Sequence, residues 1–308
     1  MYSIIYQFFY FLKRIEKRLR EKNAEPSKLV SFLVGYAEWF YNVPVRRWYE
    51  KHPSQKIGVN QSPREQKIIV SFTSFPKRIG GVWLVVETLL RQSYKPDEIV
   101  LWLAESQFDG LESLPEQLVK QQERGLTIRF CDDLRSHKKY FYTMQEHPDD
   151  LIILVDDDTF YSRDLVKKLV QLHNKYPSDI ISMTSTMISK VSDLPSKWHS
   201  PTCDERIVNS YLAQPYSGQG TLYPPHCLDE ENTFNKEKIM ELCPYADDLW
   251  LKLMSMRKGT LVSVVYKYRS IPVTIYGTAE SSLYYINAEG GQNDVQWQNL
   301  MDHYGVAN

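Results

Sequence analysis

From residue 67 onward, short apolar runs alternate with segments in which apolar residues recur every three or four positions. The apolar runs have the length of buried strands and lie at 67–73, 97–103, 126–131, 150–158 and 179–185. The segments with helical spacing lie at 80–93, 115–124, 137–147 and 162–176, the last with Ser162 as its expected N-cap. This alternation predicts an α/β fold, a mostly parallel sheet flanked by helices.

Ligands of such sheets bind beyond the carboxyl ends of the strands. At one of these ends, Asp156, Asp157 and Asp158 directly follow the apolar run LIILV. Three adjacent carboxylates repel one another, and a hard divalent cation, Mg²⁺ or Mn²⁺, relieves that repulsion. We therefore expect Asp156 and Asp158 to bind the metal of a metal–diphosphate complex. The alternative is an acidic turn that caps the helix from residue 162.

The N-terminal residues follow a different pattern. Residues 1–12 are nearly all apolar or aromatic, residues 13–22 hold six basic and two acidic residues, and a second mixed segment covers 29–50. The order of charge is wrong for a signal peptide, and no apolar stretch reaches the length that spans a bilayer. We predict two interfacial helices on an anionic membrane. A helical hairpin packed on the catalytic domain or on a second subunit is the open alternative.

The sequence predicts three parts. The helical, membrane-associating extension covers 1–50, a polar linker with two prolines covers 51–66, and the α/β domain covers 67–308.

Composition excludes several classes of function. The 308 residues carry 37 basic and 38 acidic side chains, a net charge of −1, which argues against a nucleic-acid binder. Four scattered cysteines favour a reducing compartment over a disulfide scaffold or a zinc module. The sequence also lacks the glycine-rich dinucleotide fingerprint, the P-loop and the G-x-S-x-G nucleophile elbow.

Several blocks together resemble bacterial GT-A glycosyltransferases of capsule and lipopolysaccharide (O-antigen) gene clusters, related to family 2. The blocks are VSFTSFPKRI (70–79), DEIVLWLAESQF (97–108), 132–166, GQGTLYPP (218–225), CPYADDLWLKLM (243–254) and NDVQWQNLM (293–301). The resemblance covers roughly 67–301. It implies a GT-A fold, a nucleotide-sugar donor, a divalent metal at the D-x-D and transfer to a growing surface glycan.

Other polar residues lie where a nucleotide sugar would bind. After the first strand come Thr73, Ser74 and Arg78, where a base, a ribose and a phosphate would lie. After the third strand a polar cluster opens a helix, with Lys138 and Lys139 suited to a diphosphate. The further expected donor-binding residues are Asp133, Asp156, Asp157, Gly218 and Gly220. Their alternatives are a capped turn, a solvated basic helix start and a plain glycine turn.

An acidic pair, Asp247 and Asp248, begins an amphipathic segment. In the resembling family such a pair supplies the base that deprotonates the acceptor, and we favour Asp248 as the base, with Asp247 orienting the acceptor. The reverse assignment and a purely helix-capping role stay open. His226 is a candidate third metal ligand in competition with His303, and His137 is expected at the surface.

Taken together, the sequence predicts a metal-dependent enzyme that moves a sugar from a UDP-sugar to a surface or lipid-linked glycan, with inversion. The predicted location is cytoplasmic, peripheral on the inner face of a bacterial inner membrane. Two alternatives stay open. One is a nucleotidyltransferase that makes sugar nucleotides, and the other is a glycan-binding or scaffold protein with a retired site.

Overall fold

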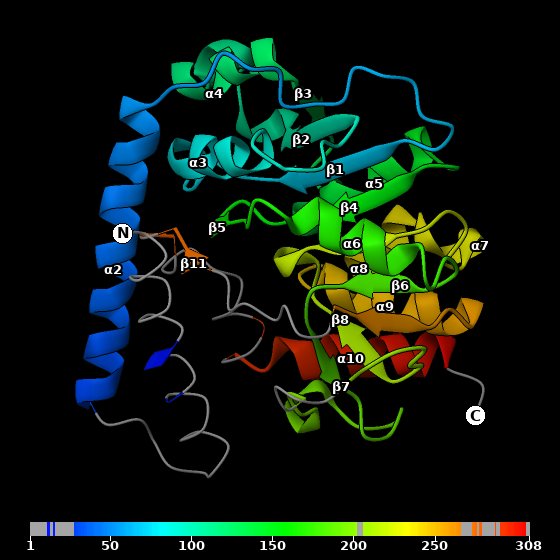
Figure 1. The fold of residues 1–308 in the computed structure, drawn as a ribbon. Helices are drawn as coiled ribbons and strands as arrows, with labels where there is room; N and C mark the ends of the chain where they lie inside the picture. Colours follow the sequence, from blue (N-terminus) through cyan, green and yellow to red (C-terminus); the bar gives the residue numbers. More distant parts are fainter. Residues whose placement is uncertain are drawn as a thin grey trace.

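The computed structural model describes residues 11–12, 15, 28–201, 206–265, 273–275, 277–278, 287 and 290–305. Its centre is a seven-stranded sheet in the order β10-β6-β9-β4-β1-β2-β3 (Figure 1). These strands are β1 (Ile68–Thr73), β2 (Glu98–Ala104), β3 (Leu126–Cys131), β4 (Leu151–Leu154), β6 (Ile180–Ser182), β9 (Thr221–Tyr223) and β10 (Val262–Val264). Neighbouring strands are parallel, except that β9 runs antiparallel to both β4 and β6. The predicted mostly parallel sheet is confirmed.

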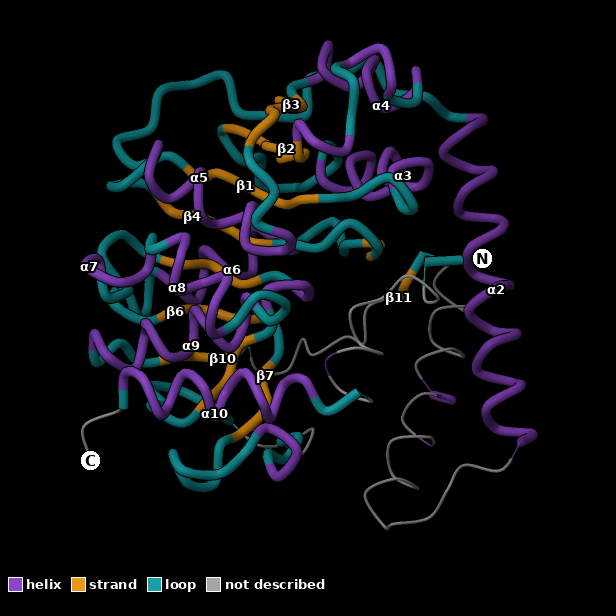
Figure 2. Tube along the Cα trace, turned by 180° about the vertical axis from the view of Figure 1, so that it is seen from behind, coloured by secondary structure: helices purple, strands orange, loops and turns teal. Residues whose placement is uncertain are grey.

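Helices cover both faces of this sheet (Figure 2). The α-helices among the described residues are α2 (Lys28–Lys51), which stands to one side, α3 (Ile79–Leu89), α4 (Glu116–Lys120), α5 (Lys138–Glu146), α6 (Leu165–His173), α7 (Glu230–Thr233), α8 (Lys236–Leu242), α9 (Asp247–Lys258) and α10 (Gln292–Tyr304). Successive side chains of a strand point to opposite faces. Thus Val70 and Phe72 of β1 join a core with α2, α3 and α6, while Ile69 joins a second core with α5, α9 and α10.

Two small sheets extend the structure beyond the central one. β5 (Thr159–Phe160) pairs with β11 (Val273–Thr274), and β7 (Ser185–Met187) pairs with β8 (Ala213–Pro215), both antiparallel. The first pair continues directly from the Asp156–Asp158 turn, and the second lies beside the start of α9 (Figure 1). Both pairs therefore extend the walls around the carboxyl ends of the strands.

Several element boundaries differ from the sequence prediction, and two of them have a clear physical reason. The strand expected at 150–158 ends at Leu154, because the N–H of Asp156 donates to Tyr161 Oη at 2.7 Å instead of to a neighbouring strand. The helix expected from residue 162 begins at Leu165, with Asp164 as its N-cap residue. Ser162 is not the cap, since its carbonyl belongs to the preceding turn and accepts the N–H of Leu165 at 3.1 Å.

The long helix α2 covers the segment predicted as helical at 29–50 and stands along one side of the molecule (Figures 1 and 2). Its Val34, Ala37 and Val45 are buried in the core shared with α3. Asn42 Nδ2 donates to the carbonyl of Thr274 at 3.0 Å, so α2 packs on the β5–β11 pair. The predicted helix at 1–22 lies outside the described residues, except for 11–12 and 15.

Residues 52–67, which contain most of the expected linker, pack along the α/β domain. The N–H of Gly58 donates to the carbonyl of Arg124 at 2.8 Å, and Arg64 Nη1 pairs with Asp97 Oδ2 at 2.8 Å. A Cβ on Gly58 would collide with Leu90, so the backbone approaches α3 closely here. No helix in the described part of the chain is long and apolar enough to cross a membrane.

One buried cation lies in the core outside the pocket. The Lys252 side chain of α9 is fully buried, and its Nζ donates to the carbonyl of Tyr211 at 2.7 Å. Burial lowers the pKa of Lys252 to about 7. The unfolded chain therefore binds more protons than the folded chain between about pH 7 and the ordinary lysine pKa, and the contribution of Lys252 to stability rises with pH across that window.

We expect Lys252→Met to stabilise the protein at pH 6.5, by roughly 1–4 kcal/mol as for other buried charges replaced by apolar groups. The gain should shrink toward pH 10, because the folded lysine is then neutral and the pH approaches the ordinary pKa of 10.5, so little free energy is needed to deprotonate it. Urea unfolding of both proteins at pH 6.5 and 9.5 measures the difference. A variant that is less stable than wild type at pH 6.5 would show that the bond to Tyr211 outweighs the burial of the charge.

Candidate active site

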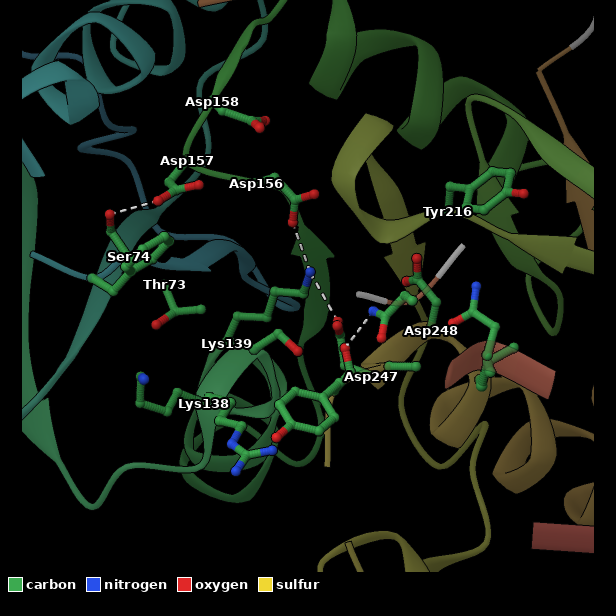
Figure 3. Close-up of a pocket in the computed structure, with 18 of the residues that line it drawn as sticks. Thr73, Ser74, Lys138, Lys139, Asp156, Asp157, Asp158, Tyr216, Asp247 and Asp248 are labelled. Atoms are coloured by element: carbon green, nitrogen blue, oxygen red, sulfur yellow. Dashed lines mark hydrogen bonds and ion pairs between the residues drawn. The ribbon is translucent and has the colours of Figure 1, made fainter. Parts of the chain in front are cut away.

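A pocket of about 630 Å³ lies at the carboxyl ends of β1, β3 and β4 and is bounded on its other side by the start of α9. Four segments singled out from the sequence line it, and they are separated by up to 175 positions in the chain. They contribute Thr73, Ser74, Arg78, Asp133, Lys138, Lys139, Asp156, Asp157, Asp158, Asp247 and Asp248 (Figure 3). The parallel strand order brings them together, because parallel strands end at the same edge.

Asp157 and Asp158 are tied to the segment that follows β1. Ser74 Oγ donates to Asp157 Oδ2 at 2.5 Å, and Arg78 Nη1 lies 2.7 Å from Asp157 Oδ1 and 3.0 Å from Asp158 Oδ2. Burial, followed by the neighbouring Asp156 carboxylate, raises the pKa of Asp158 to about 6 although Arg78 opposes the shift. Arg78 therefore fixes the acidic turn against β1. Thr73 Oγ1 is already engaged, since it donates to the carbonyl of Trp102 at 2.8 Å.

Lys139 bridges the two acidic groups of the pocket. Its Nζ lies 2.8 Å from Asp156 Oδ1 and 2.9 Å from Asp247 Oδ2 (Figure 3). Burial alone would lower the pKa of Lys139, but Asp156 and Asp247 outweigh burial and hold it well above the ordinary value. Lys139 is thus a permanent cation, and it links the turn after β4 to the first residue of α9.

Asp248 differs from its neighbour Asp247. Its Oδ1 accepts the N–H of Ser217 at 3.0 Å and the Oγ–H of Ser217 at 2.5 Å, and no cation contacts it among the described residues. Burial and the adjacent Asp247 carboxylate raise the pKa of Asp248 to about 7, whereas Lys139, against the effect of burial, lowers that of Asp247. Two neighbouring carboxylates repel each other when both are ionised, so their pKa values move apart.

The polar cluster after β3 is built around Asp133. Lys138 Nζ pairs with Asp133 Oδ1 at 2.8 Å, and the same oxygen accepts the N–H of Arg135 at 2.9 Å. Arg135 has a positive φ of 53°, and its guanidinium lies 3.9 Å from the centre of the Tyr245 ring. Positive φ is uncommon outside glycine and accompanies constrained segments. The two lysines therefore do different things: Lys139 spans the pocket and Lys138 holds its own loop.

Gly218 and Gly220 do not line the pocket, but they support it. A Cβ on Gly218 would overlap the carboxylate of Asp156, and Gly220 has φ +101° with its missing Cβ directed at Leu165. Tyr161 Oη donates to the carbonyl of Gly218 at 2.5 Å and accepts the N–H of Asp156. The glycines let the 217–220 loop approach the acidic turn closely.

The structure corrects two predictions about histidines. His226 lies at the opposite edge of the sheet, exposed, with Nδ1 2.9 Å from Glu230 Oε1 and Nε2 3.1 Å from Asp149 Oδ1. It is not a third ligand beside Asp156, because it follows β9, which runs antiparallel to β4 and so ends at the other edge.

His137, expected at the surface, is fully buried, and its Nε2 lies 2.8 Å from the carbonyl of Cys243. Burial lowers its pKa to about 4, so the ring is neutral. The competing candidate His303 does not line the pocket, and neither does Trp250, which is buried in the core.

Residues that the sequence analysis passed over complete the site. Tyr161 and Ser217 position Asp156 and Asp248, and Tyr216 and Trp198 line the wall near α9. Tyr161 and Ser217 could have been found from their positions in the sequence. Tyr161 closely follows the acidic turn, and Ser217 directly precedes Gly218. Trp198 offered no signal, because it lies outside every strand-end segment.

The pocket suits a divalent cation. Six carboxylates line it against four cationic side chains, which leaves an excess of negative charge. Asp156 keeps 43% of its side chain exposed. The described residues contain no cluster of three or more His, Cys, Asp or Glu around one point. Mg²⁺ and its relatives commonly take one or two carboxylates and complete their shell with substrate phosphates and water, which fits Asp156 and Asp158.

Residues 79–229 match the family Glycosyl transferase family 2. No curated protein sequence matches the chain. Among solved structures, the mannosyltransferase PcManGT from Pyrobaculum calidifontis, in complex with GDP-Man and Mn²⁺, superposes with a TM-score of 0.52 at 13% identity, over 88% of this chain and 73% of that chain. TarS of S. aureus superposes with a TM-score of 0.45 at 12% identity, over 66% of this chain and 35% of that chain.

The superposition on PcManGT shows that the two chains share a fold, the GT-A fold, and that fold explains why a mostly parallel sheet carries the pocket at its carboxyl edge. The match of residues 79–229 to a glycosyltransferase family identifies the chain as a glycosyltransferase.

Proposed function

We propose that this glycosyltransferase moves a sugar from a UDP-sugar to a hydroxyl of a glycan, with inversion at the anomeric carbon. One observation carries the proposal: the acidic turn Asp156–Asp158 and the carboxylate of Asp248 share one pocket and are connected through Lys139 and Asp247. A transferase needs a place for an anionic leaving group and a base for the acceptor, and these are the two ends of that connection.

The donor half of the pocket is the part near β1, β3 and β4. Thr73, Ser74 and Arg78 lie where β1 ends, and Lys139 presents a permanent cation between the two halves. In our proposal the nucleoside lies against the β1 end and the diphosphate extends toward Lys139, which stabilises the charge that develops on the leaving group. PcManGT was solved with GDP-Man, so the choice of uridine rests on the general association of D-x-D sites with UDP and is itself to be tested.

Asp156 and Asp158 are the residues that would hold a divalent cation, and a bound cation would neutralise the diphosphate. The Mn²⁺ in the PcManGT complex supports this assignment. Arg78 takes part indirectly, since it fixes Asp157 and Asp158 in the turn.

Asp248 is the proposed base. Its raised pKa, about 7, suits a group that must accept a proton near neutral pH. In the step we propose, the acceptor O–H proton goes to Asp248 and the acceptor oxygen bonds to the anomeric carbon. The bond from that carbon to the phosphate oxygen breaks, and its electron pair leaves with the nucleotide. Asp247 already pairs with Lys139, so only Asp248 is left to deprotonate the acceptor. Direct displacement requires only one base.

A panel of nucleotide sugars tests the function. The full chain is incubated with UDP-, GDP- and other nucleotide sugars in the presence of Mn²⁺, and nucleotide release is measured with and without glycan acceptors. Release from one UDP-sugar that a glycan accelerates, with the opposite anomeric configuration in the product, is the expected result. Release from GDP-sugars alone would overturn the choice of nucleotide, and retention of configuration would overturn direct displacement.

We further propose that the enzyme works at the cytoplasmic face of a bacterial inner membrane, on a lipid-linked glycan of a surface polysaccharide such as O-antigen or capsule. The support is one face of α2, on which Phe32, Tyr36, Trp39 and Phe40 are between 42% and 67% exposed. The rings of Tyr36 and Phe40 stack with centroids 6.0 Å apart, so they form a continuous aromatic stripe. Stripes of this kind fit the interfacial region of a bilayer.

The distribution of charge along the chain favours an anionic membrane, rather than an uncharged apolar surface, as the partner of the aromatic stripe. Residues 1–51 hold ten basic and five acidic residues, so the rest of the chain has a net charge of −6. The exposed Arg46, Arg47 and Lys51 extend the stripe at its C-terminal end. The opposite face of α2 packs on the β5–β11 pair, which begins one residue after Asp158. A membrane bound to the stripe would therefore lie near the pocket.

We expect the full chain to bind vesicles of phosphatidylcholine with phosphatidylglycerol, and Trp39→Ser/Phe40→Ser to reduce that binding about tenfold or more. Burying one large apolar side chain contributes about 1.5–3 kcal/mol. Flotation at 0.15 M salt measures the bound fraction. Tyr94→Ser/Leu111→Ser is the matched control, because these side chains are 39% and 37% exposed but lie outside α2. Equal loss in both variants, or no binding by wild type, contradicts the proposal.

A further inference from the structure

The two halves of the pocket differ in chemistry. Ser74, Asp157 and Asp158 lie on one side in Figure 3, while Tyr216 and Asp248 lie on the other. The described lining residues from Thr186 onward are uncharged, except for Asp247 and Asp248. They are instead aromatic, amide or hydroxyl side chains, with Thr186, Trp198, Gln214, Tyr216 and Tyr245 among them. This half therefore offers ring faces and neutral hydrogen-bonding groups around the proposed base.

Tyr216 is exposed although it is held firmly in place. The residue is 38% exposed, yet Thr186 Oγ1 donates to Tyr216 Oη at 2.5 Å, and Thr221 Oγ1 donates to the Tyr216 carbonyl at 2.9 Å. The next residue, Ser217, bonds Asp248 through both its N–H and its hydroxyl. A rigid aromatic ring is thus presented to the pocket one residue away from the partner of the base.

Trp198 forms another aromatic part of this wall. Its Nε1 donates to the carbonyl of Asp193 at 2.9 Å, and its ring meets Trp297 edge-on with centroids 5.1 Å apart. The nearby Ser196 is anchored to α10, because its Oγ donates to Asp294 Oδ2 at 2.5 Å. The polar atom of the indole is therefore used within the protein, while the side chain lines the pocket.

Gln214 adds an unused hydrogen-bond acceptor. Its side chain is almost fully buried at the pocket wall, and its Nε2 donates to the carbonyls of Pro215 and Asp248 at 2.9 and 3.0 Å. Its Oε1 has no partner among the described residues. An unpaired buried acceptor is costly, and a small shift of the amide toward a ligand hydroxyl would satisfy it.

We propose that this half of the pocket is an acceptor subsite for a neutral pyranose, which stacks on Tyr216 with Trp198 at its edge and directs one hydroxyl to Asp248. The inference rests on the proposed function and adds the class of acceptor. The C–H face of a sugar matches an aromatic ring, and its hydroxyls match amides and hydroxyls. An acidic sugar would meet Asp247 and Asp248 in a pocket whose six carboxylates outnumber its four cations. The cation nearest this wall, Arg135, already stacks on Tyr245, so the site selects against uronates.

Direct binding tests the subsite without turnover. Saturation-transfer NMR on the full chain with UDP and the diamagnetic Mg²⁺ compares methyl glycosides of glucose, galactose, mannose and N-acetylglucosamine with methyl glucuronide and methyl galacturonide. We expect at least one neutral glycoside to bind about tenfold or more tightly than either uronide. Tyr216→Ala should weaken that binding about tenfold, which corresponds to about 1.4 kcal/mol, and Tyr216→Phe should retain it because the ring remains.

Tyr94→Ala is the matched control, since Tyr94 is 39% exposed and lies outside the pocket, and it should bind as wild type does. Thermal melting of each variant establishes that it is folded. Uronides that bind as well as neutral glycosides, a Tyr216→Ala variant with wild-type affinity, or no binding of any glycoside would each overturn the inference. The proposed function fails separately, through the absence of nucleotide release from every nucleotide sugar.

Discussion

Asp248→Asn is expected to lower the turnover number about 10²–10⁴-fold, the usual contribution of a positioned general base. The asparagine oxygen can still accept both bonds from Ser217, so the local structure should persist. The amide cannot take a proton from the acceptor. Initial-rate kinetics with the nucleotide sugar identified in the panel measure the loss, and titration with UDP alone tests whether donor binding remains.

The stability of the same variant separates a base from a helix cap. Burial and Asp247 raise the pKa of Asp248, so the ionised carboxylate destabilises the folded protein; this cost grows with pH from the unfolded pKa and is complete above about pH 7. Asp248→Asn should therefore melt at the same or a higher temperature at pH 8. A lower melting temperature, with residual activity that follows the folded fraction, would mean that Asp248 only caps α9.

The pH profile of the wild-type enzyme gives an independent test. The carboxylate form is the active one, so kcat/KM should rise with pH through about 7, where Asp248 titrates. Asp247→Asn should behave differently, because it removes a partner of Lys139 and so disturbs the donor half. A profile that stays flat between pH 5 and 8 would remove Asp248 from the role of base.

The fold was accessible from the sequence because strands and helices alternate with distinct periods. The apolar runs of β1 and β2 are buried on both faces of a parallel sheet, so both strands could be found from the sequence. The location of the site followed from the same topology, since residues such as Arg78 and Asp157 come directly after strands. The strands and the location of the site were therefore predicted from local periodicity and from the rule that ligands bind at strand ends.

What the sequence could not show depended on contacts between distant segments. Lys138 and Lys139 are adjacent and chemically alike, yet Lys139 spans the pocket and Lys138 pairs within its own loop. Likewise, nothing local distinguishes a buried His137 from a surface histidine. The error for His226 has a clear cause: the direction of β9 cannot be deduced from three residues, and that direction decides at which edge His226 lies.

Removal of divalent cations tests the role of the acidic turn Asp156–Asp158. EDTA should reduce sugar transfer about 10²–10³-fold, the size of loss that follows removal of one charged group acting on the transition state. Added Mn²⁺ or Mg²⁺ should restore it. Asp158→Asn should reproduce much of this loss in excess metal, because it removes a proposed ligand while the amide keeps the shape of the side chain.

Calorimetric titration with the nucleotide sugar gives a readout that does not depend on turnover: wild type should bind it more weakly in EDTA, and Asp158→Asn should show little further dependence on metal. Asp149→Asn serves as the matched control, since Asp149 precedes β4 and lies at the opposite edge of the sheet beside His226. Asp158 also pairs with Arg78, so a purely structural role predicts a lower melting temperature with unchanged metal dependence. Full activity in EDTA would show that Lys139 and Arg78 suffice for the diphosphate, and the acidic turn would then serve only to hold those two cations in place.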